Sequence, residues 1–521
     1  MGSTHQSWEQ IVSQKRTARD QLLAPYLIDD IEHRGPRALN VDQRSRLEKD
    51  PQVQEITDID NIVVLLQLLQ KGELTAESVI KAYIKRAVVA HQLTNCLTEV
   101  CFTEALEHAK ALDAEFEITR QPKGPLHGIP ITLKDQFNVK GLDTTIGYVG
   151  RSFSPANEDA VLVQMLKNMG AIVIAKTNLC QSIMWAETEN PLWGLTTNAR
   201  NPSFTPGGST GGEGPLLALH GSILGFGTDI GGSVRIPQSV AGLYGLKPSS
   251  SRFPYHGLPV STEGQEHVPS SNPRCAPLPW NELSFREIQQ RPLVIGLILD
   301  DGVVKVHPPI ARALRELSAA LKAAGHEIVI WDTSDHATAI EIMDQYYTVD
   351  GGEDIRRDIA VAGEPYIPHV EALVNRGKPI SVYEYWQLNK RKAAAHKKYL
   401  DKWNGARSDS GKPVDILLSP TLPHTSVPHR KFRWVGYTKI WNFLDYPALT
   451  FPVDQVKADR DQLPEEPYKP RNSVDEWNWN LYDAEQVDGY PVNLQIIGRK
   501  LEEEKVLGAA TVIEKIWKSR I

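Results

Sequence analysis

Two serines, each in a glycine-rich segment, are the residues of this chain best suited to chemistry. Ser209 lies in the segment GGSTGG at 207–212, and Ser233 ends the segment TDIGGS at 228–233. Glycine is used where the backbone adopts φ > 0 or approaches another group closely, so we expect both serines on tight, exposed bends. One such segment alone is typical of a loop, but two segments with a serine in each favour a reactive site.

Ser233 is the better candidate for a nucleophile. The bend at 228–233 can turn successive N–H groups toward one point. An oxyanion hole beside a nucleophile requires this arrangement, because the negative charge of a tetrahedral intermediate is held by such donors. The residues therefore indicate acyl transfer at Ser233.

A serine nucleophile needs a neighbouring base, and Lys134 is the candidate that the sequence offers. His220 is the one histidine near either serine, but the flanking Leu217 and Leu219 indicate a packed helix and a structural role. A lysine can act as a base when burial lowers its pKa enough for a neutral amine to exist near neutral pH. Lys134 follows the apolar run GIPITL at 128–133, which is typical of a strand that leads into the interior.

Three motifs of the chain together resemble the amidase signature family. They are GGSTGG at 207–212, GTDIGGSVRIP at 227–237 and GLKP at 245–248. The chain is most similar to the fungal general amidases or acetamidases, and more distantly to fatty acid amide hydrolase. Further matches extend the resemblance over nearly the whole chain, and they lie at 124–135, 176–178, 418–421 and 489–495.

The resemblance implies a role for each candidate residue. Ser233 would be the nucleophile that forms the acyl-enzyme, Ser209 the bridging serine and Lys134 the terminal base. The substrate-binding positions implied by the family are Ser209, Ile230, Gly231, Gly232 and Ser233. The backbone N–H groups of the last four would hold the oxyanion.

The resemblance implies three further features of the site. The peptide bond before Ser209 would be cis, Asp229 and Arg235 would brace the nucleophile loop, and Met184 would lie near the substrate. For Met184 a role in the core is equally compatible with the sequence. The implied reaction is hydrolysis of a linear carboxamide to a carboxylic acid and ammonia or an amine, with no cofactor and no metal.

The composition excludes several other classes of protein. With 521 residues, 41% hydrophobic and 23% charged, the chain is predicted to be globular, and its net charge of −7 offers no basic patch for nucleic acid or an anionic membrane. Residues 1–19 contain no apolar segment of a secretory signal, and the apolar stretch 62–69 is too short to span a bilayer. We therefore predict a cytoplasmic enzyme whose partner is a small-molecule amide, and the oligomeric state is left open, with a homodimer as one alternative.

The cysteines agree with a cytoplasmic location. The chain has four of them, Cys96, Cys101, Cys180 and Cys275, and their spacing matches neither CxxC nor a zinc motif. That usage is typical of reduced thiols in a cytosolic protein.

The order of apolar and polar segments predicts an α/β fold. Residues 1–60 are expected to form an N-terminal helical arm, and Thr75 is expected to cap a helix with Val79, Ile80 and Tyr83 on one face. From 128 onward strand-like and helical runs alternate; the predicted strands are 129–133, 171–175, 293–299, 327–331, 416–418, 448–453 and 492–497. We predict a single α/β/α sandwich over 61–521, with a large mixed sheet covered by helices, as in the amidase signature fold.

One segment departs from the family pattern. After Ser271 the chain jumps to Asn272-Pro273, where several tens of residues look absent, so a deletion near 271–273 is expected. This departure motivates a second hypothesis, an inactive amidase-like protein retained for binding or as a scaffold. A glutamine-dependent amidotransferase subunit and an esterase are further alternatives, since both use the same acyl-enzyme chemistry.

Overall fold

The computed structural model describes residues 6–29, 31, 47–262, 275 and 278–519. The chain forms two compact units, each built from segments that are distant in sequence. Unit 1 is made of residues 1–228, 254–273 and 353–374, and unit 2 of residues 229–253, 274–352 and 375–521. The chain passes from unit 1 to unit 2 after Thr228, the first residue of the second glycine-rich segment. The expected deletion near 271–273 lies outside the described residues.

Unit 1 contains a four-stranded sheet with the order β1-β3-β2-β6. The strands are β1 (Leu97–Val100), β3 (Ile172–Thr177), β2 (Pro130–Lys134) and β6 (Leu224–Phe226). β2 is parallel to both of its neighbours, whereas β1 is antiparallel to β3. Every residue of β2 and β3 is buried, which explains why the two strands appear in the sequence as continuous apolar runs.

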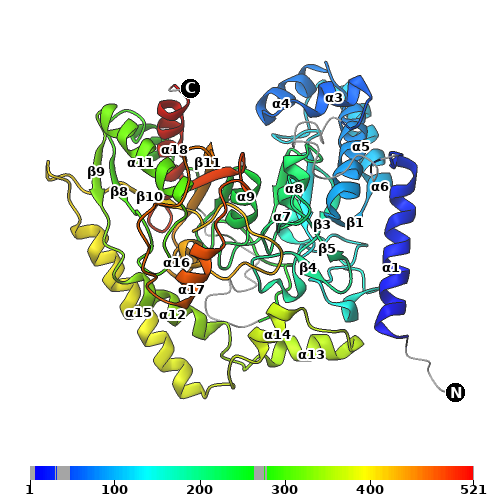
Figure 1. The fold of residues 1–521 in the computed structure, drawn as a ribbon. Helices are drawn as coiled ribbons and strands as arrows, with labels where there is room; N and C mark the ends of the chain where they lie inside the picture. Colours follow the sequence, from blue (N-terminus) through cyan, green and yellow to red (C-terminus); the bar gives the residue numbers. More distant parts are fainter. Residues whose placement is uncertain (1–5, 30, 32–46, 263–274, 276–277, 520–521) are drawn as a thin grey trace. The chain divides into compact units, whose positions relative to one another are not determined.

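Helices pack against this sheet (Figure 1). They include α5 (Ala76–Thr94), α6 (Phe102–Thr119), α7 (Val161–Asn168) and α8 (Glu213–Ala218). The hydroxyl of Thr75 accepts a hydrogen bond from the N–H of Ser78 and so caps α5, as predicted. Val79, Ile80 and Tyr83 are buried, which confirms the predicted apolar face.

The remaining elements of unit 1 come from the N-terminus and from two distant segments. They are α1 (Trp8–Leu23), α3 (Pro51–Thr57), α4 (Ile62–Lys71), the short hairpin of β4 (Glu189–Asn190) and β5 (Gly194–Leu195), α13 (Glu353–Ala362) and α14 (Pro368–Val374). Lys15 of α1 forms ion pairs with Glu99 and Asp143 at 2.6 Å each. Within the range 1–60, α1 and α3 are helices and Lys15 bonds α1 to the rest of unit 1, while the arm as a unit and its boundary at residue 60 stay predictions.

Unit 2 contains a six-stranded sheet with the order β7-β11-β12-β10-β8-β9. The strands are β7 (Gly245–Lys247), β11 (Ala448–Gln455), β12 (Pro491–Ile497), β10 (Ile416–Pro420), β8 (Val294–Leu297) and β9 (Glu327–Ile330). β7, β11, β12 and β10 pair antiparallel, and β10, β8 and β9 pair parallel. The five strands predicted from 293 onward are confirmed, with ends that differ from the prediction by at most two residues.

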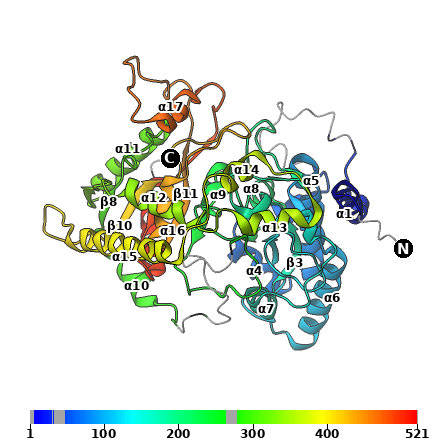
Figure 2. The ribbon, with the colours of Figure 1, turned by 90° about the horizontal axis from the view of Figure 1, so that it is seen from below.

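The helices of unit 2 lie before, between and after these strands in the sequence. They are α9 (Arg235–Ala241), α10 (Glu282–Glu287), α11 (Pro308–Ala323), α12 (His336–Tyr346), α15 (Val382–Gly405), α16 (Gly436–Phe443), α17 (Ser473–Asn480) and α18 (Glu503–Lys518). α9, α11 and α18 pack against the sheet, and α11 and α18 do so at β10, β11 and β12. Figure 2 shows α12 beside α15 and α16, against which it packs. The predicted α/β class is confirmed, but within the described residues the predicted strands are divided between a four-stranded and a six-stranded sheet and do not form the one large sheet that was predicted. No helix of the described residues is long and apolar enough to cross a membrane.

Candidate active site

Lys134 and Ser209 are brought together inside unit 1. Lys134 is the last residue of β2 and has no exposed surface, and Ser209 is 1% exposed. The Nζ atom of Lys134 lies 2.8 Å from the Oγ atom of Ser209, within hydrogen-bond distance. The prediction that an apolar strand carries this lysine into the interior is confirmed.

The sheet topology explains why a third residue, Thr228, meets Lys134. β2 and β6 are parallel neighbours, so their carboxyl ends lie at the same edge of the sheet. Thr228 follows β6 by two residues, and its Oγ1 atom lies 2.9 Å from Nζ of Lys134. Oγ1 of Thr228 also donates to Oε1 of Gln136 at 2.5 Å. Carboxyl ends of parallel strands are the usual location of sites in α/β folds.

The glycines around Ser209 allow a tight path past the neighbouring backbone. The peptide bond between Gly208 and Ser209 is cis, as the family resemblance implied. A side-chain carbon at Gly208 would come within 2.5 Å of the carbonyl oxygen of Glu187, and one at Gly211 would collide with the hydroxyl of Thr188. Close approach rather than φ > 0 therefore requires glycine at these two positions.

Glu213, in the first turn of α8, connects the Ser209 loop to the sheet. Its carboxylate accepts hydrogen bonds from the hydroxyls of Thr132 in β2, at 2.7 Å, and Thr177 in β3, at 3.0 Å. Glu213 is 1% exposed, and burial raises its pKa to about 7 in spite of these two hydrogen bonds.

We expect Glu213→Gln to reduce the pH dependence of stability. The folded chain holds a proton on Glu213 up to about pH 7, whereas the ordinary pKa is 4.5, so this group lowers the free energy of unfolding as pH rises between these values. The full effect is on the order of 3 kcal/mol at 1.4 kcal/mol per pKa unit. Urea unfolding should show that the free energy of unfolding decreases less from pH 5 to pH 8 in Glu213→Gln than in the parent chain. Glu117→Gln is the control, because the Glu117 side chain is 67% exposed. Equal decreases in Glu213→Gln and the parent chain would contradict this expectation.

Ser233 lies in unit 2, two residues before α9, on a loop organised by one buried ion pair. Nε and Nη2 of Arg235 each donate to the carboxylate of Asp229 at 3.0 Å. Burial alone would raise the pKa of Asp229, but the charge and hydrogen bonds of Arg235 outweigh burial and hold that pKa well below its usual range. Lys247 in β7 adds a second positive charge near Asp229. The predicted bracing of the loop by Asp229 and Arg235 is confirmed.

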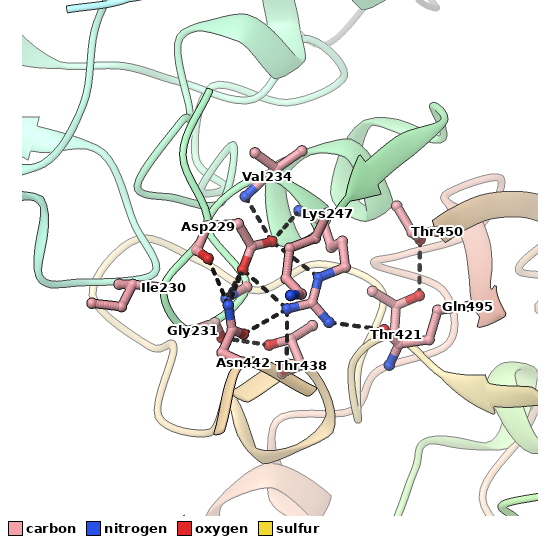
Figure 3. Close-up of polar contacts among 12 residues, drawn as sticks. Asp229, Ile230, Gly231, Val234, Lys247, Thr421, Thr438, Asn442, Thr450 and Gln495 are labelled. Atoms are coloured by element: carbon pink, nitrogen blue, oxygen red, sulfur yellow. Dashed lines mark hydrogen bonds and ion pairs between the residues drawn. The ribbon is translucent and has the colours of Figure 1, made fainter. Parts of the chain in front are cut away.

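The guanidinium of Arg235 is itself held from several directions. Nη1 donates to Oε1 of Gln495 at 3.1 Å, and Nη2 donates to Oδ1 of Asn442 at 2.7 Å (Figure 3). The amide nitrogen of Gln495 donates to the carbonyl oxygens of Pro420 and Tyr437 at 2.8 Å each. Because a carbonyl oxygen can only accept, this amide has one orientation, with its oxygen toward Arg235.

Three successive carbonyl oxygens of the loop accept hydrogen bonds from side chains of unit 2. The pairs are Asn442 with Asp229 at 2.6 Å, Tyr347 with Ile230 at 3.0 Å, and Thr438 with Gly231 at 2.7 Å. Figure 3 shows Asn442 and Thr438 reaching this loop from α16. A trans peptide directs its C=O and its N–H to opposite sides, so these contacts also orient the N–H groups of the loop.

Two expectations about the serines and their loops need correction. Ser209 and Ser233 are 1% and 8% exposed, so neither lies on an exposed bend. Gly232 has φ +129°, and a side chain at this position would collide with Thr438. The N–H of Gly232 donates to Oδ1 of Asp229 at 2.7 Å. This N–H is therefore engaged within the loop. In the described part of the chain, the N–H groups of Ile230, Gly231 and Ser233 have no such partner.

Other candidates have roles that sequence reasoning only partly anticipated. Trp441 and Phe443 belong to the core, and Asn442 between them donates a hydrogen bond to the carboxylate of Asp229. His220 lies after α8, not within a helix, and its Nδ1 contacts the carbonyl oxygen of Thr57 at 2.9 Å, which agrees with a structural role. Met184 is half-buried, and its predicted position near the substrate stays a prediction.

Several residues that organise the site were not identified from the sequence. They are Gln136, Thr228, Tyr347, Thr438 and Gln495. Gln136 directly follows the match at 124–135, and Thr228 and Gln495 lie within the matches at 227–237 and 489–495, so their positions were a usable signal. Tyr347 and Thr438 lie in segments without any motif, and nothing in the sequence alone marks them. Within the described residues no group of three or more His, Cys, Asp or Glu side chains could hold a metal ion.

Comparison with known proteins identifies the family. A family model described as Amidase matches residues 78–272 and 261–507. Amidase 1 of Gibberella moniliformis (strain M3125 / FGSC 7600) is 52% identical over 536 residues, which cover 98% of this chain and 99% of that protein. Acetamidase of Emericella nidulans (strain FGSC A4 / ATCC 38163 / CBS 112.46 / NRRL 194 / M139) is 36% identical over 483 residues, with 87% and 88% covered. The structure of fatty acid amide hydrolase matches with a TM-score of 0.91 and 31% identity, over 98% of this chain and 95% of that chain.

The fold and these relatives define a hydrolase that acts on amides. The chain belongs to the amidase family and has the amidase signature fold, as its signature motifs predicted.

Proposed function

We propose that this amidase hydrolyses linear carboxamides through an acyl-enzyme formed on Ser233. The observation that carries the proposal is the hydrogen bond of 2.8 Å between Nζ of Lys134 and Oγ of Ser209, made by two side chains with almost no exposed surface. A fully buried amine is poorly solvated as an ammonium ion, which favours the neutral form that a base must have.

The proposed relay uses two hydroxyls and one amine. Neutral Lys134 takes the proton of Ser209 while Ser209 takes the proton of Ser233, whose Oγ attacks the carbonyl carbon of the amide. Collapse of the tetrahedral intermediate breaks the C–N bond, and the proton returns through Ser209 to the departing amine. Water then attacks the acyl-enzyme by the same relay and releases the carboxylic acid. The relay requires Ser233 to reach Ser209 in the working enzyme.

The oxyanion is proposed to bind the N–H groups of Ile230, Gly231 and Ser233. The side chains of Asn442 and Tyr347 hold the carbonyl groups of Asp229 and Ile230, which share their peptide bonds with the N–H groups of Ile230 and Gly231. These two donors therefore need no rearrangement when negative charge develops. Burial raises the pKa of Tyr347 well above its ordinary value, so its hydroxyl keeps the hydrogen that it donates to Ile230.

We further propose that the substrate is a small-molecule amide and that the enzyme works in the cytoplasm, with no nucleic acid or membrane as partner. The names Amidase 1 and Acetamidase of the relatives support an amide substrate. The alternative of an inactive scaffold rested on the segment near 271–273, and the paired lysine and serine of unit 1 argue against it.

We expect a fluorophosphonate probe to label this enzyme once per chain, at Ser233, because such probes react with activated serines. Mass spectrometry of the digested protein locates the label. A panel from acetamide to long-chain and aryl amides, with matched esters, should show release of the acid from at least one amide. A folded chain that neither labels nor hydrolyses any amide would contradict the proposal. Hydrolysis of the esters alone would favour the esterase alternative, and amide hydrolysis by the isolated chain would argue against an amidotransferase subunit.

A further inference from the structure

Gln136 lies two residues after Lys134, is fully buried, and has an amide of fixed orientation. Its Nε2 atom donates to the carbonyl oxygen of Pro259 at 2.9 Å, and it also lies 3.4 Å from the hydroxyl of Tyr255. A carbonyl oxygen cannot donate, so the amide nitrogen must face Pro259. The amide oxygen of Gln136 therefore faces the opposite way, toward Thr228.

This orientation determines where the hydroxyl hydrogen of Thr228 lies. Oγ1 of Thr228 is 2.5 Å from Oε1 of Gln136, and an amide oxygen can only accept. The hydroxyl of Thr228 must therefore donate to Gln136, and this bond uses the one hydrogen that the hydroxyl has.

The same reasoning extends to Lys134. Nζ of Lys134 lies 2.9 Å from Oγ1 of Thr228, whose hydrogen is already committed to Gln136. Thr228 can only accept from the amine, so an N–H of Lys134 points at Thr228. The lone pair of a neutral amine is thereby excluded from this direction, while Oγ of Ser209 lies 2.8 Å from the same nitrogen.

We infer that Gln136 is a positioning residue for the catalytic base, because it makes Thr228 an acceptor and so directs the lone pair of Lys134 toward Ser209. This inference rests on the proposed function, in which Lys134 takes the proton of Ser209. Without Gln136, the hydroxyl of Thr228 is able to donate to the neutral amine. It then competes with Ser209 for the lone pair and at the same time stabilises the neutral amine.

The test is the pH profile of kcat/KM for Gln136→Leu on the best amide of the panel. We expect the plateau at high pH to decrease about 10- to 100-fold, a part of the 10²- to 10⁴-fold contribution of a general base. The midpoint of the acid limb should move to lower pH, because the neutral amine gains a hydrogen bond. A purely structural role would lower the plateau without moving the midpoint. Gln136→Met, unbranched and of similar length, replaces the leucine variant if that variant does not fold.

A double-mutant cycle with Thr228→Val tests whether Gln136 acts through Thr228. Valine has no hydroxyl to orient, so Gln136→Leu should cause less than a threefold further loss in the Thr228→Val background. Tyr255→Phe is the matched control, because it removes another contact of Gln136 and should leave the profile unchanged. Equal losses from Gln136→Leu in both backgrounds, or an unmoved midpoint, would overturn the inference.

The outcomes separate this inference from the proposed function. Loss of turnover in Ser233→Ala together with an unchanged profile in Gln136→Leu would reject the positioning role and leave the acyl-enzyme mechanism intact. Full turnover in Ser233→Ala would reject the mechanism, and the positioning role with it.

Discussion

Replacing Ser233 by alanine is expected to reduce kcat/KM on amides by about 10⁴-fold or more, because the acyl-enzyme cannot form without its oxygen. The fold should persist, since the substitution removes one oxygen from a loop that is held by Asp229 and Arg235. Steady-state kinetics on the amide panel, with thermal unfolding of the same sample, measure both effects. Ser239→Ala is the matched control, because Ser239 is a buried serine of α9 outside the proposed relay, and it should keep most of the activity.

Variants of Lys134 and Ser209 should show that the relay acts as a unit. Lys134→Met and Ser209→Ala are each expected to lower kcat about 10²- to 10⁴-fold, the range of general acid–base catalysis. The double variant should be little worse than either single variant, because removing one member already interrupts the proton transfer. If the loss of kcat in the double variant equals the product of the losses in the two single variants, the two residues act independently. Turnover by Ser233→Ala comparable to that of the parent enzyme would reject the mechanism.

Arg235→Met is expected to have the largest effect on stability, a loss of about 3–5 kcal/mol in the free energy of unfolding. Arg235 has no exposed surface, and the methionine would leave the carboxylate of Asp229 buried without its main charge partner. Gln495 and Asn442 would also lose their hydrogen bonds to Arg235 beside the loop of the proposed nucleophile Ser233, so activity should fall with stability. Urea unfolding and amide hydrolysis measure the two losses.

A second substitution shows whether the loss of stability in Arg235→Met comes from the unpaired charge of Asp229 or from lost packing. Asp229→Asn removes the negative charge, so adding it to Arg235→Met should cost less than the sum of the two single variants. Arg286→Met is the exposed control, because Arg286 is 68% exposed and pairs with Glu282 on the surface of α10. Such a pair is worth about 0–1 kcal/mol. A loss of less than about 1 kcal/mol in Arg235→Met would contradict the assigned role of the buried pair.

The strands could be predicted from the sequence because each follows a local rule. β2, β3, β10 and β12 are buried along their whole length, and a strand buried on both faces appears as a continuous apolar run. The distribution of these strands over a four-stranded and a six-stranded sheet could not be read from the runs, because strand order depends on pairing between distant segments. β8 and β10, for example, are hydrogen-bonded neighbours although α11, α12 and α15 lie between them in sequence.

The candidate site divides in the same way. Lys134 and Ser209 were found because glycine-rich motifs and an apolar strand are local signals, and their contact at 2.8 Å agrees with that prediction. Gln495 ends the recognised match at 489–495, but its contact with Arg235, 260 residues away, could not be predicted because it depends on how the two segments meet in the fold.

The sequence by itself determined the family, the α/β class and the serines and lysine proposed to carry the chemistry, because glycine motifs and apolar runs are short stretches of consecutive residues. Only the tertiary structure decided how these residues are held. Tyr347 reaches Ile230 across 117 positions, Asn442 reaches Asp229 across 213, and Gln136 reaches Thr228 across 92. The direction of a hydrogen bond depends on which donor and acceptor meet in space, so the orientation of the proposed base and of the loop N–H groups exists only in the folded chain.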